Sequence, residues 1–259
     1  MARDAVSLRT VDLLGIFWRS FFIQASWSYD RLQSLGFAFA LLPALRRLYP
    51  DKAELSSRLA VHTEYFNTQP YFASFILGAA ARAEEERAAG KKPDLDAAEL
   101  KTNLMAPLGA LGDSFFWGSL KPFAAAAAVA VLLTGAWWAP LLFLVLYNVV
   151  HVGLRFSLVF IGYSTQGDVL GLISRYSITR LARRYKVMSL AIVGCIVGTV
   201  SVWGPSFRPA MAVPAPGLAA AGLALTLVLT ALLRFGATPV NLMIGLAAAC
   251  LAGAWGGIV

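Results

Sequence analysis

Long stretches without a charged side chain dominate the second half of the chain. Residues 122–154, 187–207, 209–233 and 235–259 contain no Asp, Glu, Lys or Arg. A helix needs about 20 mostly apolar residues to cross the hydrocarbon core of a bilayer. The last three runs therefore predict one membrane-spanning helix each. The first run is long enough for two, and residues 134–140 predict the break between them, because Gly and Pro interrupt a helix and paired Trp suits the membrane interface.

The first half of the chain mixes charge with shorter apolar segments. Apolar residues recur near a period of 3.6 over 13–22, which predicts a helix that begins close to Thr10 and lies at the membrane interface or on the bundle. Segments 35–45 and 103–122 are apolar but interrupted by Gly and Pro. Such segments predict broken or re-entrant helices, and we expect 103–122 to form a hairpin that dips into the membrane and turns back.

Two further patterns complete the expected architecture. Residues 51–70 predict a helix that ends before Pro70, since the residue before a proline avoids the α conformation. The charged stretch 82–93 predicts a solvated helix end and turn, followed by a second soluble helix over 94–101. The fold class expected is an all-α membrane protein, a multi-span helical bundle with re-entrant, Gly/Pro-broken helical hairpins.

Three regions are expected along the chain. Residues 1–60 form N-terminal interfacial helices and a first short apolar segment, and residues 61–122 form a core with broken helices. Residues 123–259 form transmembrane helices, with a basic loop near 174–186.

Composition and charge support a membrane protein. The chain is 58% hydrophobic and 14% charged, whereas a soluble domain has about 25% charged residues. The net charge is +8, but the basic residues do not form a soluble face, so we expect no nucleic-acid partner. They concentrate at 175–186, directly before an apolar run, and the positive-inside rule places that loop in the cytoplasm.

The candidate chemistry lies in residues 64–70. Glu64, Asn67 and Gln69 stand there beside aromatic residues, in a chain that otherwise avoids polar groups. Polar groups that cannot face lipid need an interior use. Carboxylate and amide groups beside aromatic faces match an uncharged, hydroxyl-rich solute such as a sugar. The alternative is that these side chains bind backbone groups exposed by broken helices.

Two other polar residues have competing interpretations. Asp113 contacts a ligand or gates it, or else caps a half-helix that begins at Ser114. His62 could accept a phosphoryl group, but one His near a helix end is more often a structural, hydrogen-bonded residue. The sequence shows no metal cluster, nucleophile–base pair or phosphate-binding P-loop, so we expect no catalytic residue, metal site or cofactor.

Several short segments occur together and in the order of a known family. They are residues 27–37, 43–50, 66–70, 76–78, 84–90 and 109–113. With them the chain resembles the IID component of the mannose–fructose–sorbose type phosphoenolpyruvate-dependent sugar phosphotransferase system (PTS). The resemblance runs over about residues 13–168 and fades beyond.

The resemblance implies a function and partners. It implies a multi-pass protein of the bacterial inner membrane that pairs with a IIC membrane subunit, and that binds and translocates a hexose. Cytoplasmic IIA and IIB proteins would relay phosphate through histidines, and IIB would phosphorylate the sugar.

Departures from the family pattern keep an alternative open. Ser114 stands where the family usually has Pro, and the polar insert at 206–217 is short. The alternative is a structural or regulatory membrane protein that kept the fold and lost translocation. An unrelated secondary transporter is disfavoured, because acid-rich ion relays are absent from the expected spans.

Overall fold

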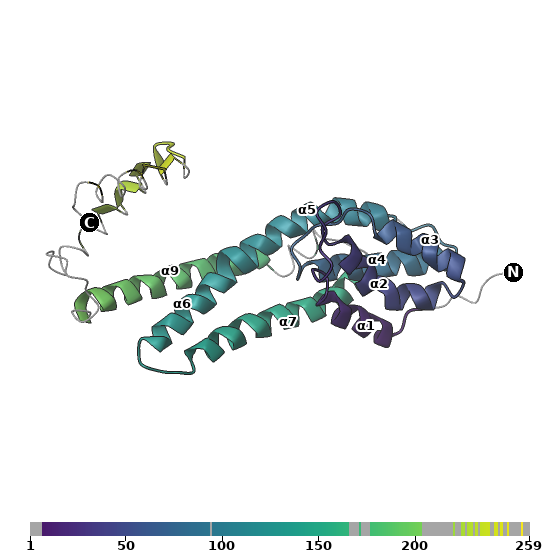
Figure 1. Cartoon of the computed structure of the whole chain (residues 1–259), viewed down its shortest axis with the longest axis horizontal. Coiled ribbons are helices and arrows are strands. Elements are labelled where there is room, and N and C mark those ends of the chain that lie inside the picture. Colours follow the sequence, from purple (N-terminus) through teal and green to yellow (C-terminus); the bar gives the residue numbers. More distant parts are fainter. Residues whose placement is uncertain are drawn as a thin grey trace. The chain divides into compact units, whose positions relative to one another are not determined.

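Helices form the fold, seen in a computed structural model that describes residues 7–93, 95–165 and 177–203, with Gly171 and scattered residues from 220 to 255. The described residues hold no strand, only two isolated bridges, so the all-helical class is confirmed. The chain divides into units Met1–Ile192 and Val193–Val259, and the sites described below lie in the first. The helices are α1 (Thr10–Ser20), α2 (Ser34–Leu48), α3 (Lys52–His62), α4 (Ala73–Ala88), α5 (Ala97–Phe115), the π-helix η1 (Phe116–Leu120), α6 (Lys121–Leu132), α7 (Ala139–Thr165) and α9 (Ile178–Trp203) (Figure 1).

Helix α4 is the centre of this unit. Twelve of its 16 residues are buried, so it is enclosed on nearly every side, which explains why its sequence lacks the one-sided pattern of a surface helix. It packs against α7, α5, α2 and α1. Its charged end is buried too, with Glu84 at 0% and Glu85 at 7% exposure. The prediction of a solvated helix end in this region is therefore wrong for these two acids.

Two glycines allow α4 and α7 to meet backbone to backbone. A Cβ atom placed on Gly78 would lie 2.0 Å from the carbonyl oxygen of Val159, and one on Gly162 would lie 2.0 Å from that of Phe75. No side chain fits at either position. Small residues at helix crossings let backbones approach closely, as is usual in membrane bundles. The site described below lies at the N-terminal end of α4, which this crossing holds in place.

The Gly- and Pro-containing segments are helical, against expectation. Helix α2 continues through Pro43, and α5 continues through Pro107 into η1 and α6 without a turn back. The predicted hairpin at 103–122 is therefore wrong. The π-helical turn takes up the irregularity, and it leaves Pro122 in the first turn of α6, where a missing N–H is tolerated.

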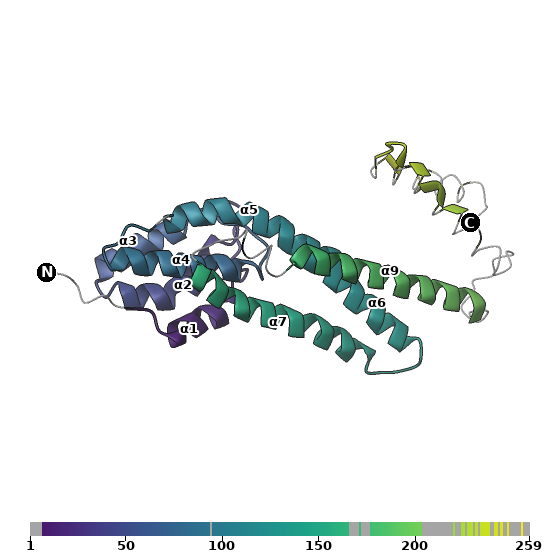
Figure 2. The same cartoon turned by 180° about the vertical axis from the view of Figure 1, so that it is seen from behind.

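A hairpin does form further along the chain. Helix α6 ends at Leu132 and α7 begins at Ala139, with Gly135 at φ +84° in the connection, so the predicted break at 134–140 is confirmed. The two helices lie side by side in both views (Figures 1 and 2). Trp137 is 82% exposed at the turn, and an exposed Trp is typical of the membrane interface.

Two helical stretches among the described residues are long and apolar enough to cross a membrane. They are Ala97–Leu132 and Ala139–Thr165. In the most apolar window of each stretch, 39% and 17% respectively is buried inside the protein, and large apolar side chains such as Leu141, Val145 and Val149 are exposed. Continuous exposed apolar surface of this kind suits lipid. Helix α9 covers most of the predicted span 187–207, whereas the predicted spans 209–233 and 235–259 lie largely outside the described residues.

Candidate functional site

The segment that carries the candidate chemistry is not helical. Helix α3 ends at His62, and the chain then runs without regular structure to the start of α4. The prediction of one helix over 51–70 is therefore wrong in its last eight residues, and Glu64 and Asn67 do not share a helix face. The reason is competition: the backbone N–H of Gln33 donates to the Phe66 carbonyl at 2.9 Å, so this backbone pairs with a distant segment rather than with itself.

Gln33 and Thr68 fix the position of this segment. The Gln33 side chain donates from Nε2 to the Thr68 carbonyl at 2.8 Å, and its Oε1 accepts from the Thr68 N–H at 3.2 Å. The Thr68 hydroxyl donates to the Met105 carbonyl of α5 at 2.8 Å. All backbone polar groups in a buried irregular segment need such partners. The result is an irregular segment of polar residues that is held against α5.

A cavity of about 630 Å³ lies between this segment and α5. That size is within the usual range for small-molecule sites. Among the described residues, its lining includes side-chain amides, hydroxyls, two large aromatic residues and a single carboxylate, and no Lys, Arg or His. The lining residues are Gln24, Gln33, Tyr65, Asn67, Thr68, Gln69, Pro70, Thr102, Met105, Ala106, Gly109, Ala110, Asp113 and Trp117.

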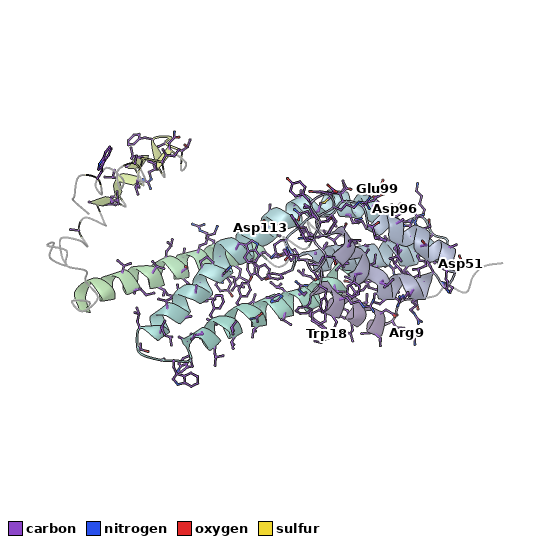
Figure 3. All side chains as sticks on the ribbon, in the orientation of Figure 1. Arg9, Trp18, Asp51, Asp96, Glu99 and Asp113 are labelled. Atoms are coloured by element: carbon purple, nitrogen blue, oxygen red, sulfur yellow. The ribbon has the colours of Figure 1, made fainter. Side chains whose placement is uncertain are left out.

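The structure brings three of the four predicted binding residues together at this cavity. Asn67, Gln69 and Asp113 line it, whereas Glu64 is exposed and is not part of the lining. Glu64 instead interacts electrostatically with Lys101 of α5. Asp113 lies inside α5 and therefore does not cap a new half-helix at Ser114. Figure 3 shows it well along that helix.

The two polar atoms of the Gln69 side chain have different surroundings. Its Oε1 accepts from the N–H groups of Tyr71 and Phe72 at 2.8 and 3.0 Å, at the start of α4. Its Nε2 is buried and has no hydrogen-bond partner among the described residues. An unpaired buried donor is unfavourable, and this one belongs to a side chain that lines a cavity. The interpretation of Gln69 as a residue that binds exposed backbone is therefore confirmed for Oε1, whereas a ligand contact by Nε2 stays a prediction.

Several lining residues were missed from the sequence. Gln24 and Thr102 lie far along the chain from residues 64–70, and no spacing rule connects them. Gln33 falls within a segment of the family resemblance, which gave a signal but no role. Trp117 lines the cavity and also packs, with its ring centroid 6.1 Å from that of Tyr71 and 5.1 Å from the Lys121 ammonium.

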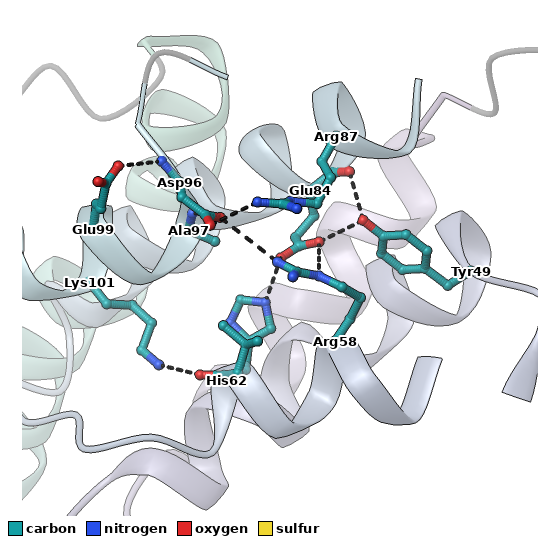
Figure 4. Close-up of polar contacts among 10 residues, drawn as sticks. Tyr49, Arg58, His62, Glu84, Arg87, Asp96, Ala97, Glu99 and Lys101 are labelled. Atoms are coloured by element: carbon teal, nitrogen blue, oxygen red, sulfur yellow. Dashed lines mark hydrogen bonds and ion pairs between the residues drawn. The ribbon is translucent and has the colours of Figure 1, made fainter. Parts of the chain in front are cut away.

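A second polar cluster is centred on Glu84, away from the cavity lining (Figure 4). Arg58 donates to both carboxylate oxygens, from Nε at 3.0 Å and from Nη2 at 2.5 Å. The Tyr49 hydroxyl donates to Oε2 at 2.7 Å, and His62 Nε2 lies 2.9 Å from Oε1. This pairing confirms His62 as a structural, hydrogen-bonded residue. The cluster joins α2, α3 and α4.

The cluster shifts the acid–base properties of its members. Burial alone would raise the pKa of Glu84, but the hydrogen bonds from His62, Arg58 and Tyr49 lower it to about 2. Burial lowers the pKa of His62 despite the neighbouring carboxylate, and burial raises that of Tyr49, with the Glu84 charge adding to the effect. Glu84 is therefore ionised and His62 neutral at pH 7.

These features define an all-helical membrane protein with a polar cavity. The family model for the PTS system mannose/fructose/sorbose family IID component matches residues 7–205, and the chain belongs to this family. The resemblance seen in the sequence is thus confirmed, and the match extends past residue 168, where it was expected to fade.

Individual relatives agree with this assignment. The chain is 38% identical to the mannose-specific EIID component of Escherichia coli (strain K12) over 188 residues, which are 72% of this chain and 66% of that protein. The match thus covers just under two thirds of that relative. The fructose permease IID component of Bacillus subtilis (strain 168) is 28% identical over 268 residues, covering 96% of both chains.

Two solved structures have the same fold. One is the cryo-EM structure of the mannose transporter ManYZ in complex with microcin E492, with 30% identity, a TM-score of 0.58, and coverage of 97% of this chain and 98% of that chain. The other is described as the structure of a membrane protein, with 30% identity, a TM-score of 0.70 and the same coverage.

Proposed function

We propose that this chain is the IID subunit of a PTS sugar permease, a multi-pass protein of the bacterial inner membrane. It pairs with a IIC membrane subunit, binds a hexose and translocates it for phosphorylation by IIB, which receives phosphate through IIA. The mannose transporter ManYZ, whose chain shares 30% identity with this one, supports a two-subunit membrane partnership.

The cavity between residues 65–70 and α5 is the observation that supports the proposal most directly. Amide groups both donate and accept hydrogen bonds, and a carboxylate accepts them, which matches vicinal sugar hydroxyls. The exposed faces of Tyr65 and Trp117 offer apolar surface for the ring. The absence of Lys, Arg and His from the described lining disfavours an anionic ligand, so the sugar binds before it is phosphorylated.

We assign the sugar contacts to Asn67, Asp113 and the free Nε2 of Gln69. For Glu64 a contact stays a prediction, since it lies outside the cavity lining. The chain itself supplies no chemistry in this proposal, and it requires no cofactor: it binds and moves the sugar, and the cytoplasmic partners transfer the phosphoryl group.

Uptake of labelled hexose tests the proposal in cells that lack their own mannose-family permease and express this chain with its IIC, IIA and IIB partners. Asn67→Ala and Asp113→Asn should each reduce uptake about tenfold, since the first removes hydrogen bonds to the sugar and the second replaces a charge-assisted hydrogen bond by a neutral one. Asn103→Ala is the matched control, because Asn103 is an exposed amide on α5 that does not line the cavity.

Three outcomes would contradict the proposal. Unchanged uptake in both cavity variants removes the site assignment. Full uptake by cells that express the partners without this chain favours the alternative, a structural or regulatory membrane protein that kept the fold and lost translocation. Transport by this chain alone, without IIC, would contradict the two-subunit proposal.

A further inference from the structure

A second cavity lies against a neighbouring face of α5. It has a volume of about 500 Å³ and lies between α5 and the first turns of α9. Its lining follows one face of each helix, because the positions recur at intervals of three, four and seven. They are Pro107, Ala110, Leu111 and Ser114 on α5, and Thr179, Ala182, Arg183 and Lys186 on α9.

The two cavities have opposite chemistry. The first has one carboxylate and no cation in its described lining, whereas the second has two cations and no carboxylate. Ala110 lines both, so α5 forms a wall that they share. Ligands of different charge are therefore expected on the two faces of this helix, an uncharged one in the first cavity and an anion in the second.

The polar groups of the second cavity suit a phosphate. An Arg guanidinium binds phosphate oxygens in a fork, a Lys ammonium adds a point charge, and hydroxyls donate further hydrogen bonds. Arg183, Lys186, Ser114 and Thr179 supply these groups from two helices.

The rest of the lining is apolar, which favours an amphipathic ligand over a fully hydrated ion. Pro107, Ala110, Leu111 and Ala182 make up this part. Directly after Lys186, helix α9 presents exposed apolar side chains, with Val187 at 60% and Leu190 at 72% exposure. Basic residues at the boundary between a polar and an apolar stretch lie at the level of lipid headgroups.

We infer that this second cavity binds the phosphate headgroup of an anionic phospholipid between α5 and α9. Arg183 and Lys186 hold the phosphate, and the apolar part of the lining contacts the adjoining glycerol and acyl groups. A soluble phosphate shares the headgroup chemistry but not the apolar contact, so the two sources can be separated by experiment. The inference does not depend on which sugar, if any, the first cavity binds.

Lipid titration of the delipidated full-length protein in detergent tests the inference. Phosphatidylglycerol, phosphatidylcholine with the same acyl chains, and inorganic phosphate are added separately, and bound lipid is measured by native mass spectrometry. Arg183→Gln with Lys186→Gln removes the two cations of the cavity. Arg180→Gln with Arg184→Gln is the matched control, because it removes the same charge from exposed positions of the same helix that do not line the cavity.

The expected result is selective binding of phosphatidylglycerol. The cavity variant should bind it about 25-fold more weakly, the product of a roughly fivefold loss for each cation, while the control variant should bind it as the unaltered protein does. Equal losses in both variants would overturn the inference, since they would show only diffuse attraction to a basic helix. Binding of inorganic phosphate as tight as that of the lipid would overturn the lipid assignment in favour of a soluble ligand.

Discussion

Replacement of Glu84 by Gln tests the role of the buried cluster that joins α2, α3 and α4. The Glu84 side chain is completely buried and holds Arg58, His62 and Tyr49. Its pKa falls from 4.5 to about 2 in the folded protein. A difference of about 2.5 pKa units corresponds to about 3 kcal/mol, which agrees with the roughly 3–5 kcal/mol lost when one partner of a buried ion pair is removed.

The sign of the pH dependence follows from the direction of this shift. Because the pKa of Glu84 is lowered in the folded state, its contribution is fully present above pH 4.5 and is lost as the pH falls from about 4.5 to about 2. Glu84→Gln should therefore destabilise the protein at pH 7 and remove most of this loss at acid pH.

Thermal unfolding of the full chain in detergent measures the effect. A loss of about 3 kcal/mol should lower the apparent melting temperature by about 6–12 °C for a chain of this size. The control is Glu86→Gln on the same helix, where Glu86 pairs with Arg82 at 2.9 Å near the surface, and such pairs contribute at most about 1 kcal/mol. If Glu84→Gln lowers the melting temperature no more than Glu86→Gln does, the reasoning is refuted.

Three further outcomes are expected. Gly162→Leu should prevent the protein from folding, because its Cβ would lie 2.0 Å from the Phe75 carbonyl, and the folded peak should be lost on size-exclusion chromatography. Gly153→Leu is the control and should be tolerated, because nothing lies within 4 Å of its Cβ position. Normal elution of Gly162→Leu would contradict the close crossing. Gln33→Ala should speed proteolysis within residues 63–72, since two buried hydrogen bonds to this backbone are lost at roughly 1 kcal/mol each; an unchanged cleavage pattern would count against this. Stability should fall as the pH drops below about 6.5, because the pKa of His62 is lowered on folding and the unfolded chain takes up the proton first; His62→Asn should flatten that part of the melting-temperature profile.

The broad architecture could be predicted from the sequence because its signals are local. Charge-free runs and the break at 134–140 predicted the α6–α7 hairpin, and a 3.6-residue period predicted α1 (Thr10–Ser20). The broken helices failed as a prediction because Gly and Pro have local propensities that packing overrides. Pro43 lies within a continuous helix, and its ring packs against the backbone at Gly15.

The candidate site was predictable in part for the same reason. Asn67, Gln69 and Asp113 were identified as unusual polar residues in an apolar chain, and they line one cavity. Gln33, which holds the neighbouring Thr68 in place, acts through contacts across 35 residues of chain, which no local pattern encodes. Glu84 looked like one charge among many in a solvated stretch, and only the fold shows that it is buried.

The unbroken path from α5 through η1 into α6 has a mechanical consequence. Asp113 and Trp117 belong to the same continuous helix that continues into α6, one arm of the α6–α7 hairpin. No loop separates that arm from the cavity lining, so a tilt of the arm would be transmitted along the helix. The wider π turn at Phe116–Leu120 is the point where the helix bends most easily. Trp117, within that turn, would thus follow a movement of the α6 arm, whereas Asp113, on the α5 side of the turn, would stay with α5.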